Sequence, residues 1–354
     1  MAKLGVLTFH SCINYGSFWQ ARCLVQGLRS LGAKPVVLDH RSDRVSRAEW
    51  RCALQPLRPA RTARPDISLY ASKIRKFLSA FASFPLSAAF ALDEPFTPED
   101  CDLVIVGSDE VWNLRHPWYG GVPLFYGEGL SAKRLVSYAA TFGSHPAANG
   151  LESYWADKLQ RFHAISVRDD NSRTIIERAL GREAALVLDP CLQFPETITT
   201  GRNVFDPGTY IAIYGHSFPS WFQQEARRWA ASRSLRLVSI GYRNEWADEQ
   251  WLDGGPYEFA GFIAEAEAVV TNFFHGCVFA LVNAKPFACA LSDYRSNKIR
   301  DLAHLVGAQR HVVSQRTPQA GYEAILGDVP EPAIAHRLAE LRRQSRNYLT
   351  DVLE

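Results

Sequence analysis

The chain has 354 residues, of which 47% are hydrophobic and 21% are charged, and its formal net charge is +2. This near balance of charges does not indicate a nucleic-acid-binding protein. No run approaches the roughly 20 apolar residues of a membrane span, and the amino terminus lacks a signal-peptide pattern. The seven cysteines are scattered without a C-x-x-C pair. They favour reduced thiols, and hence a cytoplasmic protein, over a disulfide framework or a zinc site.

Short apolar runs alternate with amphipathic stretches along the chain, which is typical of parallel sheets covered by helices. A first set of six strands is predicted, with a helix over residues 17–32 after the first of them. These strands are residues 3–9, 35–40, 102–109, 134–140, 163–170 and 185–190. A second set of four strands follows, with helices through residues 225–234, 258–266 and 273–284. Its strands are residues 209–216, 235–241, 267–272 and 285–291.

The two sets predict an α/β protein of two Rossmann-like, doubly wound domains. They are joined near residues 190–207, a segment rich in Pro, Gly and Thr. Residues 331–353 predict a long amphipathic helix that docks on a domain, with one apolar face interrupted only by Ser345. That face consists of Ile334, Leu338, Leu341, Tyr348 and Val352.

Residues 41–76 are unusually basic, with ten Lys or Arg against three Asp or Glu. One interpretation is a solvated loop followed by a helix. The other is a basic lip for an anionic or membrane-anchored substrate, with peripheral contact to the inner face of the membrane.

In doubly wound sheets, ligands bind beyond the carboxyl ends of the strands. After the first strand, Asn14, Tyr15 and Gly16 fall at such a position, and Gly16 permits a tight turn. The alternative is an ordinary turn with Ser17 as the helix cap.

Two further strand ends carry polar groups. Ser108 and Asp109 come just after the apolar part of the strand 102–109, where a carboxylate can hold sugar hydroxyls or accept a proton, or can simply cap a helix. Trp112 offers a stacking face for a sugar or is part of the core. Arg168 ends the strand 163–170, where it can fork two hydrogen bonds to a carboxylate or phosphate, or pair with Asp169 or Asp170.

The stretch EAVVTNFFHGCVFALVN, residues 267–283, places a histidine in the first turn of an apolar helix. Asn272 is the expected N-cap, and the helix start favours an anion beside His275. Gly276 would leave room for a ligand, and Phe273 and Phe274 would exclude water. A histidine placed there is either a hydrogen-bonded core residue or a proton donor and acceptor.

With these stretches in hand, the chain resembles the polysaccharide pyruvyl transferase family. The resemblance lies in NYGSFWQA, VGSDEVWN, SYAATFG, ISVRDD, VLDP and PYEFAGFIAEAEAVVTNFFHG, in this order along the chain. It implies a GT-B-like arrangement of two domains with a cleft between them. It also implies transfer of the pyruvyl group of phosphoenolpyruvate to sugar hydroxyls, forming a cyclic ketal and releasing phosphate.

The positions of polar residues at strand ends, taken together with the resemblance, suggest roles for particular segments and residues. Residues 1–195, with a basic insertion at 41–95, would form the acceptor side, and residues 196–354 the donor side. Catalytic roles would fall to His275, Arg168 and Asp109. Donor binding would fall to Arg168, Asn272, Phe274, His275, Gly276 and Lys298. Acceptor binding would fall to Asn14, Tyr15, Gly16, Ser108, Asp109 and Trp112.

Phosphoenolpyruvate as donor and a glycan or glycoside acceptor, lipid-linked or free, are the expected partners, with no cofactor and no metal. Phe18 and Trp19 are bulkier than the family's usual residues, at positions where an acceptor would lie. Two alternatives stay open. The first is a GT-B glycosyltransferase that uses a nucleotide sugar, and the second is a non-catalytic binding member of the family.

Overall fold

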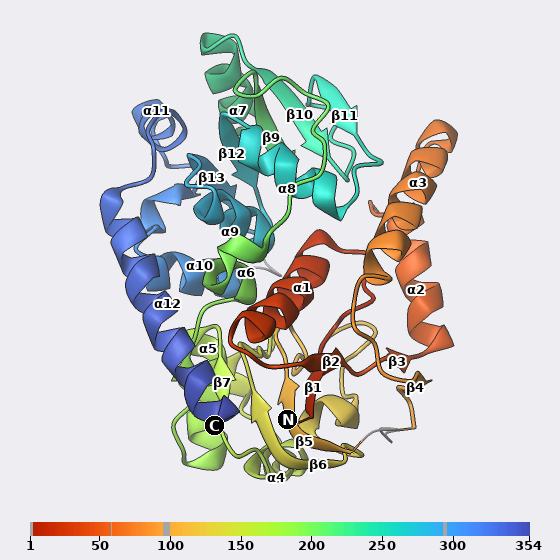
Figure 1. Ribbon diagram of the computed structural model, residues 1–354. Helices are drawn as coiled ribbons and strands as arrows, with labels where there is room; N and C mark the ends of the chain where they lie inside the picture. The colour runs from red at the N-terminus through yellow and green to blue at the C-terminus, as the bar shows by residue number, and fades with distance from the viewer. Residues whose placement is uncertain (1–2, 58, 95–99, 293–295) are drawn as a thin grey trace. The chain divides into compact units, whose positions relative to one another are not determined.

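The computed structural model describes residues 3–57, 59–94, 100–292 and 296–354 (Figure 1). The chain forms two compact units. The amino-terminal unit comprises residues 1–49, 81–197 and 338–354, and the carboxy-terminal unit comprises residues 50–80 and 198–337. The grouping differs from the sequence-based segments at two places, because residues 50–80 pack with the second unit and residues 338–354 with the first.

The amino-terminal unit contains a parallel sheet in the order β2-β1-β5-β6. These strands are β1 Leu4–Leu7, β2 Pro35–Val37, β5 Cys101–Val106 and β6 Ala132–Ser137. A parallel bridge between Val136 and Ala164 continues the sheet toward the paired strands β7 Ser166–Val167 and β8 Ala185–Leu186. The short strands β3 His40–Arg41 and β4 Phe90–Ala91 pair separately.

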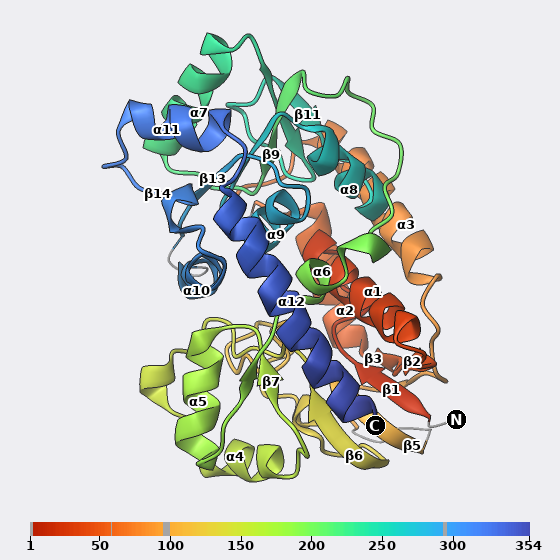
Figure 2. The same ribbon diagram turned by 60° about the vertical axis from the view of Figure 1, so that its left-hand side comes forward.

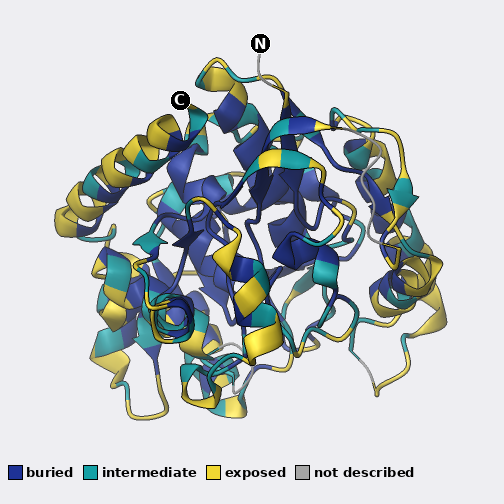
Figure 3. Ribbon diagram, turned by 90° about the horizontal axis from the view of Figure 1, so that it is seen from below, coloured by how far each residue is buried: buried dark blue, intermediate teal, exposed yellow. Residues whose placement is uncertain are grey.

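Helices bury this sheet, which explains its almost continuous apolar sequence. They are α1 Tyr15–Ser30, α4 Ser153–Gln160, α5 Asp170–Leu180 and the short α6 Pro190–Gln193. Ile176 of α5 joins Val104 and Val106 of β5 in one apolar cluster. The strands are accordingly buried, whereas the outer faces of the helices are exposed (Figure 3).

The carboxy-terminal unit contains a parallel sheet in the order β11-β10-β9-β12-β13-β14. Its strands are β9 Tyr210–Tyr214, β10 Arg236–Ile240, β11 Glu249–Trp251, β12 Ala268–Thr271, β13 Phe287–Ala290 and β14 Val312–Val313. Counted along this unit, the order is 3-2-1-4-5-6, which is that of dinucleotide-binding folds. The sequence predicted four of these strands, whereas β11 and β14 are too short to give a period.

Helices cover both faces of the second sheet. They are α7 Ser220–Ser232, α8 Pro256–Glu265, α9 Phe274–Val282, α10 Ser296–Val306 and α11 Gln319–Gly327. On one face, α7 and α11 pack on Ile211 and Ile213. On the other, the ring of Phe259 in α8 lies 4.7 Å from that of Tyr214 and 5.0 Å from that of Phe279 in α9. The alternation of Ile213 and Tyr214 follows from the two-residue period of a strand.

The basic segment is more ordered than a solvated loop followed by a helix, which corrects that interpretation. It forms two helices, α2 Asp43–Leu54 and α3 Arg64–Phe81. In the carboxy-terminal unit, Arg243 donates through Nη2 to Asp66 Oδ1 at 2.6 Å. Lys73 donates through Nζ to the carbonyl of Gly241 at 2.9 Å, and burial lowers the pKa of Lys73 to about 7. The buried face of α3 is thus held to the end of β10.

The predicted terminal helix is confirmed as α12 Pro332–Leu353, with Ile334, Leu338, Leu341 and Val352 buried. Its last turns pack on the amino-terminal unit (Figure 2). Ser345 Oγ accepts a hydrogen bond from the backbone N–H of Leu188 at 2.9 Å, and Tyr348 donates to the carbonyl of Ser137 at 2.8 Å. The single polar residue on the apolar face therefore satisfies a buried backbone group. Among the described helices, none has the length and apolar character to cross a bilayer.

Candidate active-site residues

The strand order of the amino-terminal sheet reverses between β1 and β5. In doubly wound sheets, ligands bind where the loops that leave two such strands diverge, at the carboxyl edge of the sheet. Residues 8–14 follow β1, and residues 107–110 follow β5. The predicted acceptor residues before Trp112 lie at this position, as the sequence rule requires.

Asp109 is the centre of a buried hydrogen-bond network at that edge. Its Oδ2 accepts from Ser17 Oγ at 2.7 Å, and its Oδ1 accepts from Arg168 Nη2 at 3.2 Å. Arg168 also donates through Nη1 to Asp189 Oδ2 at 2.8 Å. Burial opposes the charge on the guanidinium, but Asp109 and Asp189 outweigh it and raise the pKa of Arg168. The network fixes one cation between two carboxylates.

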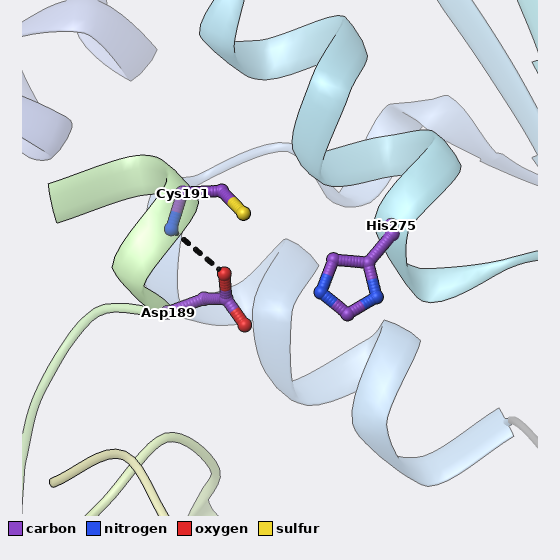
Figure 4. A group of neighbouring side chains, drawn as sticks. All are labelled: Asp189, Cys191 and His275. Carbon is purple, nitrogen blue, oxygen red and sulfur yellow. Dashed lines mark hydrogen bonds between the residues drawn. The ribbon is translucent and has the colours of Figure 1, made fainter. Parts of the chain in front are cut away.

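The partners of Arg168 differ from those that the sequence offered. Asp169 is instead the N-cap of α5 and accepts from the backbone N–H of Ser172 at 2.7 Å. Asp170 pairs with Arg173. Asp189 also caps α6, where its Oδ1 accepts from the backbone N–H of Cys191 at 3.0 Å (Figure 4). Arg168 thus links two loops that are far apart in the sequence.

The first predicted loop has Asn14, rather than Ser17, as its helix cap. Asn14 Oδ1 accepts from the backbone N–H of Ser17 at 3.1 Å, and the helix begins at Tyr15. Asn14 is half-buried, whereas the other five predicted acceptor residues are buried. They are Tyr15, Gly16, Ser108, Asp109 and Trp112. Asn14 is therefore the member of the set that a ligand reaches most easily.

Trp112 is not a stacking platform, because its ring is fully buried and its Nε1 donates to the carbonyl of Phe125 at 2.8 Å. Phe18 and Trp19 are also fully buried, so their rings do not line an exposed surface. Ser108 donates to the side chain of Gln20 inside the unit. These side chains therefore pack beneath the carboxyl edge of the sheet and are not part of its surface.

The backbone conformation and the close packing at position 107 require a glycine. Its φ of 105° lies in the region that favours glycine. A Cβ at this position would lie 2.7 Å from the carbonyl oxygen of Tyr138. The turn after β5, and with it the position of Asp109, depends on the missing side chain.

Two buried clusters at the same edge escaped the sequence interpretation. His10, just after β1, contacts Asp39 through Nε2 at 3.1 Å, and Asp39 also accepts from Arg41. Although burial opposes ionisation, these bonds lower the pKa of Asp39 to about 2. His10 directly follows the predicted strand 3–9, and Asp39 is the next-to-last residue of the predicted strand 35–40, so the strand-end rule could have found both.

The second cluster joins Cys12 in the loop after β1 to Glu49 in α2. Glu49 Oε2 accepts from the backbone N–H of Ile13 at 3.2 Å, and Cys12 Sγ lies 3.8 Å from the hydroxyl of Tyr119. Burial raises the pKa of Glu49 to about 7, although hydrogen bonds from Cys12 and Ile13 act the other way. No sequence signal marks Glu49, because its helix was interpreted as a loop.

We expect Glu49→Gln to stabilise the protein at pH 8 but not at pH 5. Because the folded-state pKa of about 7 exceeds the ordinary value of 4.5, the parent loses stability as the pH rises between these values. Glutamine keeps the acceptor oxygen and removes this loss, which amounts to at most roughly 3 kcal/mol. The free energy of unfolding in urea at both pH values measures the effect. Stability curves of parent and variant that stay parallel between pH 5 and pH 8 would contradict this expectation. The control is Glu183→Gln, at an exposed residue, which should behave like the parent at both pH values.

In the carboxy-terminal unit the strand order reverses between β9 and β12. Gly215 and His216 follow β9, and residues 272–275 follow β12. His275 extends from the first turn of α9 and is 9% exposed (Figure 4). The predicted placement of a histidine in the first turn of the helix that follows a buried strand is therefore confirmed, and the sheet order adds that this strand lies beside the switch point.

Asn272 is not the N-cap of α9, because Phe273 occupies that position and the helix begins at Phe274. The side-chain amide of Asn272 is used elsewhere: its Nδ2 donates to the carbonyl of His216 at 2.7 Å. Asn272 thereby ties together the two loops that flank the switch point.

Gly276 serves packing rather than ligand access. A Cβ there would lie 2.0 Å from Thr271 Oγ1. That hydroxyl donates to the carbonyl of Tyr214 at 2.6 Å and accepts from the backbone N–H of Phe273 at 3.0 Å. The close approach of α9 to the end of β12 orients the helix start, and with it His275.

The remaining predicted donor residues lie at the same edge of the sheet. The ring of Phe274 meets that of His275 edge-on, with centroids 5.1 Å apart. Lys298 is half-buried in the first turn of α10, which follows β13. Both α9 and α10 therefore begin at the carboxyl ends of neighbouring parallel strands.

A family model described as polysaccharide pyruvyl transferase matches residues 14–294. No curated protein matches the sequence. A solved alpha-glucosyltransferase (AGT) in complex with UDP is similar over 99% of this chain and 95% of its own, with a TM-score of 0.52 and 10% identity. MnaA of S. aureus with UDP is similar over 100% and 97%, with a TM-score of 0.48 and 13% identity. The predicted fold class, α/β with Rossmann-like domains of the GT-B kind, is confirmed.

Proposed function

Since the chain belongs to the polysaccharide pyruvyl transferase family, we propose that it uses phosphoenolpyruvate to place a cyclic pyruvyl ketal on a glycan or glycoside. Family membership makes it a polysaccharide-modifying enzyme. The donor, the ketal product and the absence of a cofactor and a metal are our proposals. The observation that carries them is His275 in the first turn of α9, at the switch point of the carboxy-terminal sheet.

We assign donor binding to the carboxy-terminal unit. The amino terminus of α9 carries the positive end of the helix dipole, which favours a phosphate or a carboxylate. Lys298 adds a positive charge at the start of α10. Phe274, which is buried, limits the access of water to this edge. Asn272 and Gly276 hold the helix start in place and act as positioning residues.

In the proposed reaction His275 donates a proton to the methylene carbon of phosphoenolpyruvate, and an oxocarbenium-like centre forms at the second carbon. A sugar hydroxyl bonds to this carbon and returns its proton to the imidazole. The bond to the phosphate oxygen then breaks, a second hydroxyl of the same sugar adds, and its proton leaves with phosphate. General acid–base catalysis of this kind suits a single imidazole that is used twice.

We assign acceptor binding to the amino-terminal unit, with Asn14 as the residue that contacts the sugar. Asp109 remains a catalytic candidate, and its hydrogen bonds to Ser17 and Arg168 hold the loops at this edge in place. Arg168 has both terminal nitrogens on carboxylates. We therefore propose that Arg168 positions Asp109 and Asp189, in place of the direct grip on the donor that the family resemblance implied.

The test is turnover by the purified full-length protein with phosphoenolpyruvate and a panel of glycosides. We expect release of phosphate together with an acceptor that gains pyruvate less water. A ketal and an enol ether have the same mass, so NMR must decide between them. In D₂O the ketal should carry one deuteron in its methyl group, because the added proton comes from an exchangeable site on the enzyme.

Other outcomes would contradict the proposal. Vinylidene protons in the product would replace the ketal by an enol ether. The 3-2-1-4-5-6 strand order of the carboxy-terminal unit also fits a nucleotide. Sugar transfer from UDP-glucose without consumption of phosphoenolpyruvate would therefore make the protein a glycosyltransferase. Binding without turnover of either donor across the panel would favour a non-catalytic member.

A further inference from the structure

The exposed face of α3 carries an amphipathic stripe that the proposed reaction does not use. Its residues share one side of the helix because they recur at intervals of three and four positions. We name this the α3 stripe: Arg64, Ile67, Ala71, Arg75 and Leu78. Ile67 is 41% exposed and Leu78 is 42% exposed, so the stripe alternates exposed aliphatic and basic side chains.

The opposite face of α3 is fixed, so the stripe has a defined outward direction. Asp66, Tyr70, Lys73 and Phe77 are buried. The Asp66 carboxylate accepts from Arg243, and the hydroxyl of Tyr70 accepts from the backbone N–H of Arg243 at 3.2 Å. The helix therefore cannot turn to bury the stripe without breaking these contacts.

The neighbouring segment adds aromatic and basic groups. Trp50, near the end of α2, is 46% exposed. A hollow of about 810 Å³ lies beside the segment that joins α2 to α3. It is lined by Gln55, Pro59, Arg61, Thr62, Arg64 and Ile67. Two guanidinium groups and an amide are donors that bind phosphate oxygens, whereas the Thr62 hydroxyl donates to the carbonyl of Leu54.

The charge of this region is strongly one-sided. Residues 50–80 contain seven Lys or Arg and one acidic residue, Asp66. Asp66 is buried against Arg243, so it does not offset the exposed charges. Within the described part of the chain, no carboxylate lies within ion-pair distance of Arg61, Arg64 or Arg75. The surface is therefore complementary to an anionic partner.

We propose that the α3 stripe, with Trp50 and the adjacent hollow, docks on a membrane that contains anionic phospholipid. Arginines meet lipid phosphates, tryptophan favours the headgroup level, and aliphatic side chains enter the acyl boundary. A nucleic acid would satisfy the arginines but would leave Ile67 and Leu78 in contact with charged phosphates, so the mixed surface favours a bilayer. This inference is independent of the proposed reaction and gives the basic insertion a role.

The test is cosedimentation of the full-length protein with lipid vesicles. We expect binding to vesicles of phosphatidylglycerol mixed with phosphatidylcholine, weakened by salt, and little binding to phosphatidylcholine alone. Inorganic phosphate at equal concentration should not displace the protein, because the aliphatic contacts need the bilayer.

Two independent double variants test the surface. Ile67→Ser with Leu78→Ser, and Arg64→Gln with Arg75→Gln, should each weaken vesicle binding at least roughly tenfold. The matched controls lie in the same unit: Val329→Ser, at a residue that is 71% exposed, and Arg227→Gln on α7 should bind like the parent. Pyruvyl transfer to a water-soluble glycoside should be unchanged in every variant, which separates this inference from the proposed function.

Three results would overturn the inference. The first is a parent protein that binds neither kind of vesicle, or both equally in high salt. The second is unchanged binding in both double variants. The third is a stripe variant that converts an oligomer into a monomer in light scattering, because the occupant of the surface would then be a second copy of the chain.

Discussion

Replacing His275 by glutamine is expected to lower the rate of pyruvyl transfer by roughly a thousandfold while leaving the fold intact. The proposed reaction needs a proton on the methylene carbon of the donor, and glutamine cannot supply one. The fold should tolerate the change, since the residue lies in the first turn of α9, where the helix does not depend on its side chain. Binding of phosphoenolpyruvate should persist, because the helix start and Lys298 remain.

The measurements are kcat, the KM for phosphoenolpyruvate, and deuterium incorporation into the product methyl in D₂O. A fall in kcat with little change in KM fits loss of a group that acts in the transition state. His304→Gln, on the exposed side of α10, is the control and should behave like the parent. If His275→Gln keeps activity within a few-fold of the parent, with an unchanged melting temperature, His275 is not the proton donor.

The second large effect is expected from Arg168→Met, which should lower the free energy of unfolding by about 3–5 kcal/mol. Methionine keeps the apolar volume but leaves the carboxylates of Asp109 and Asp189 without their shared cation. The side chains of Arg168 and Asp189 are each 1% exposed, so water cannot take the place of the guanidinium. Denaturant unfolding of the purified variant measures the loss.

A triple variant tests whether the lost stability comes from the two carboxylates that are left without a cation. Adding Asp109→Asn and Asp189→Asn to Arg168→Met should recover part of the stability, because the uncompensated charges disappear. Arg173→Met removes a surface pair with Asp170 and should cost less than about 1 kcal/mol. If Arg168→Met instead has the stability of the parent and a raised KM for phosphoenolpyruvate, Arg168 binds the donor directly and the positioning role is rejected.

If Arg168 has the positioning role that we propose, a buried ion pair serves the reaction without contact to the substrate. A buried guanidinium between two carboxylates contributes little net stability, but it allows few other arrangements. Through Ser17 and Asp109 it connects the start of α1 to the loop after β5. Through Asp189 it reaches the start of α6. If this edge binds the acceptor as we propose, loops held in this way keep it in one conformation before the substrate arrives.

The interpretation of the sequence succeeded where the signal is local. Buried parallel strands are runs of apolar residues such as VVL or LVIV, and each predicted strand overlaps an observed one. The terminal helix followed from a period that repeats over six turns. His275 was found because a strand, a turn and an apolar helix succeed one another within a short stretch. These features need no information from distant residues.

The interpretation failed where neighbours in space decide. The sequence around Trp112 does not distinguish a ring that stacks on a sugar from a ring in the core. The contacts of this ring with those of Phe142 and Phe162 show that it belongs to the core. Asn272 has an N-cap side chain, but the carbonyl of His216 takes its amide, and the helix starts later. Gly276 is needed because Thr271 lies against the helix, which cannot be inferred from the glycine itself.

The sequence by itself determined the α/β class, the terminal helix, and the strand ends at which polar side chains gather, because periodicity and the direction of parallel strands are properties of the local chain. Only the tertiary structure decided the partners of Arg168, which lie 59 and 21 residues away in Asp109 and Asp189. It also decided that burial raises the pKa of Glu49 and that residues 50–80 pack with the carboxy-terminal unit. Charge pairing and burial depend on which segments lie close together in space, and a local sequence pattern does not give the distance between distant segments.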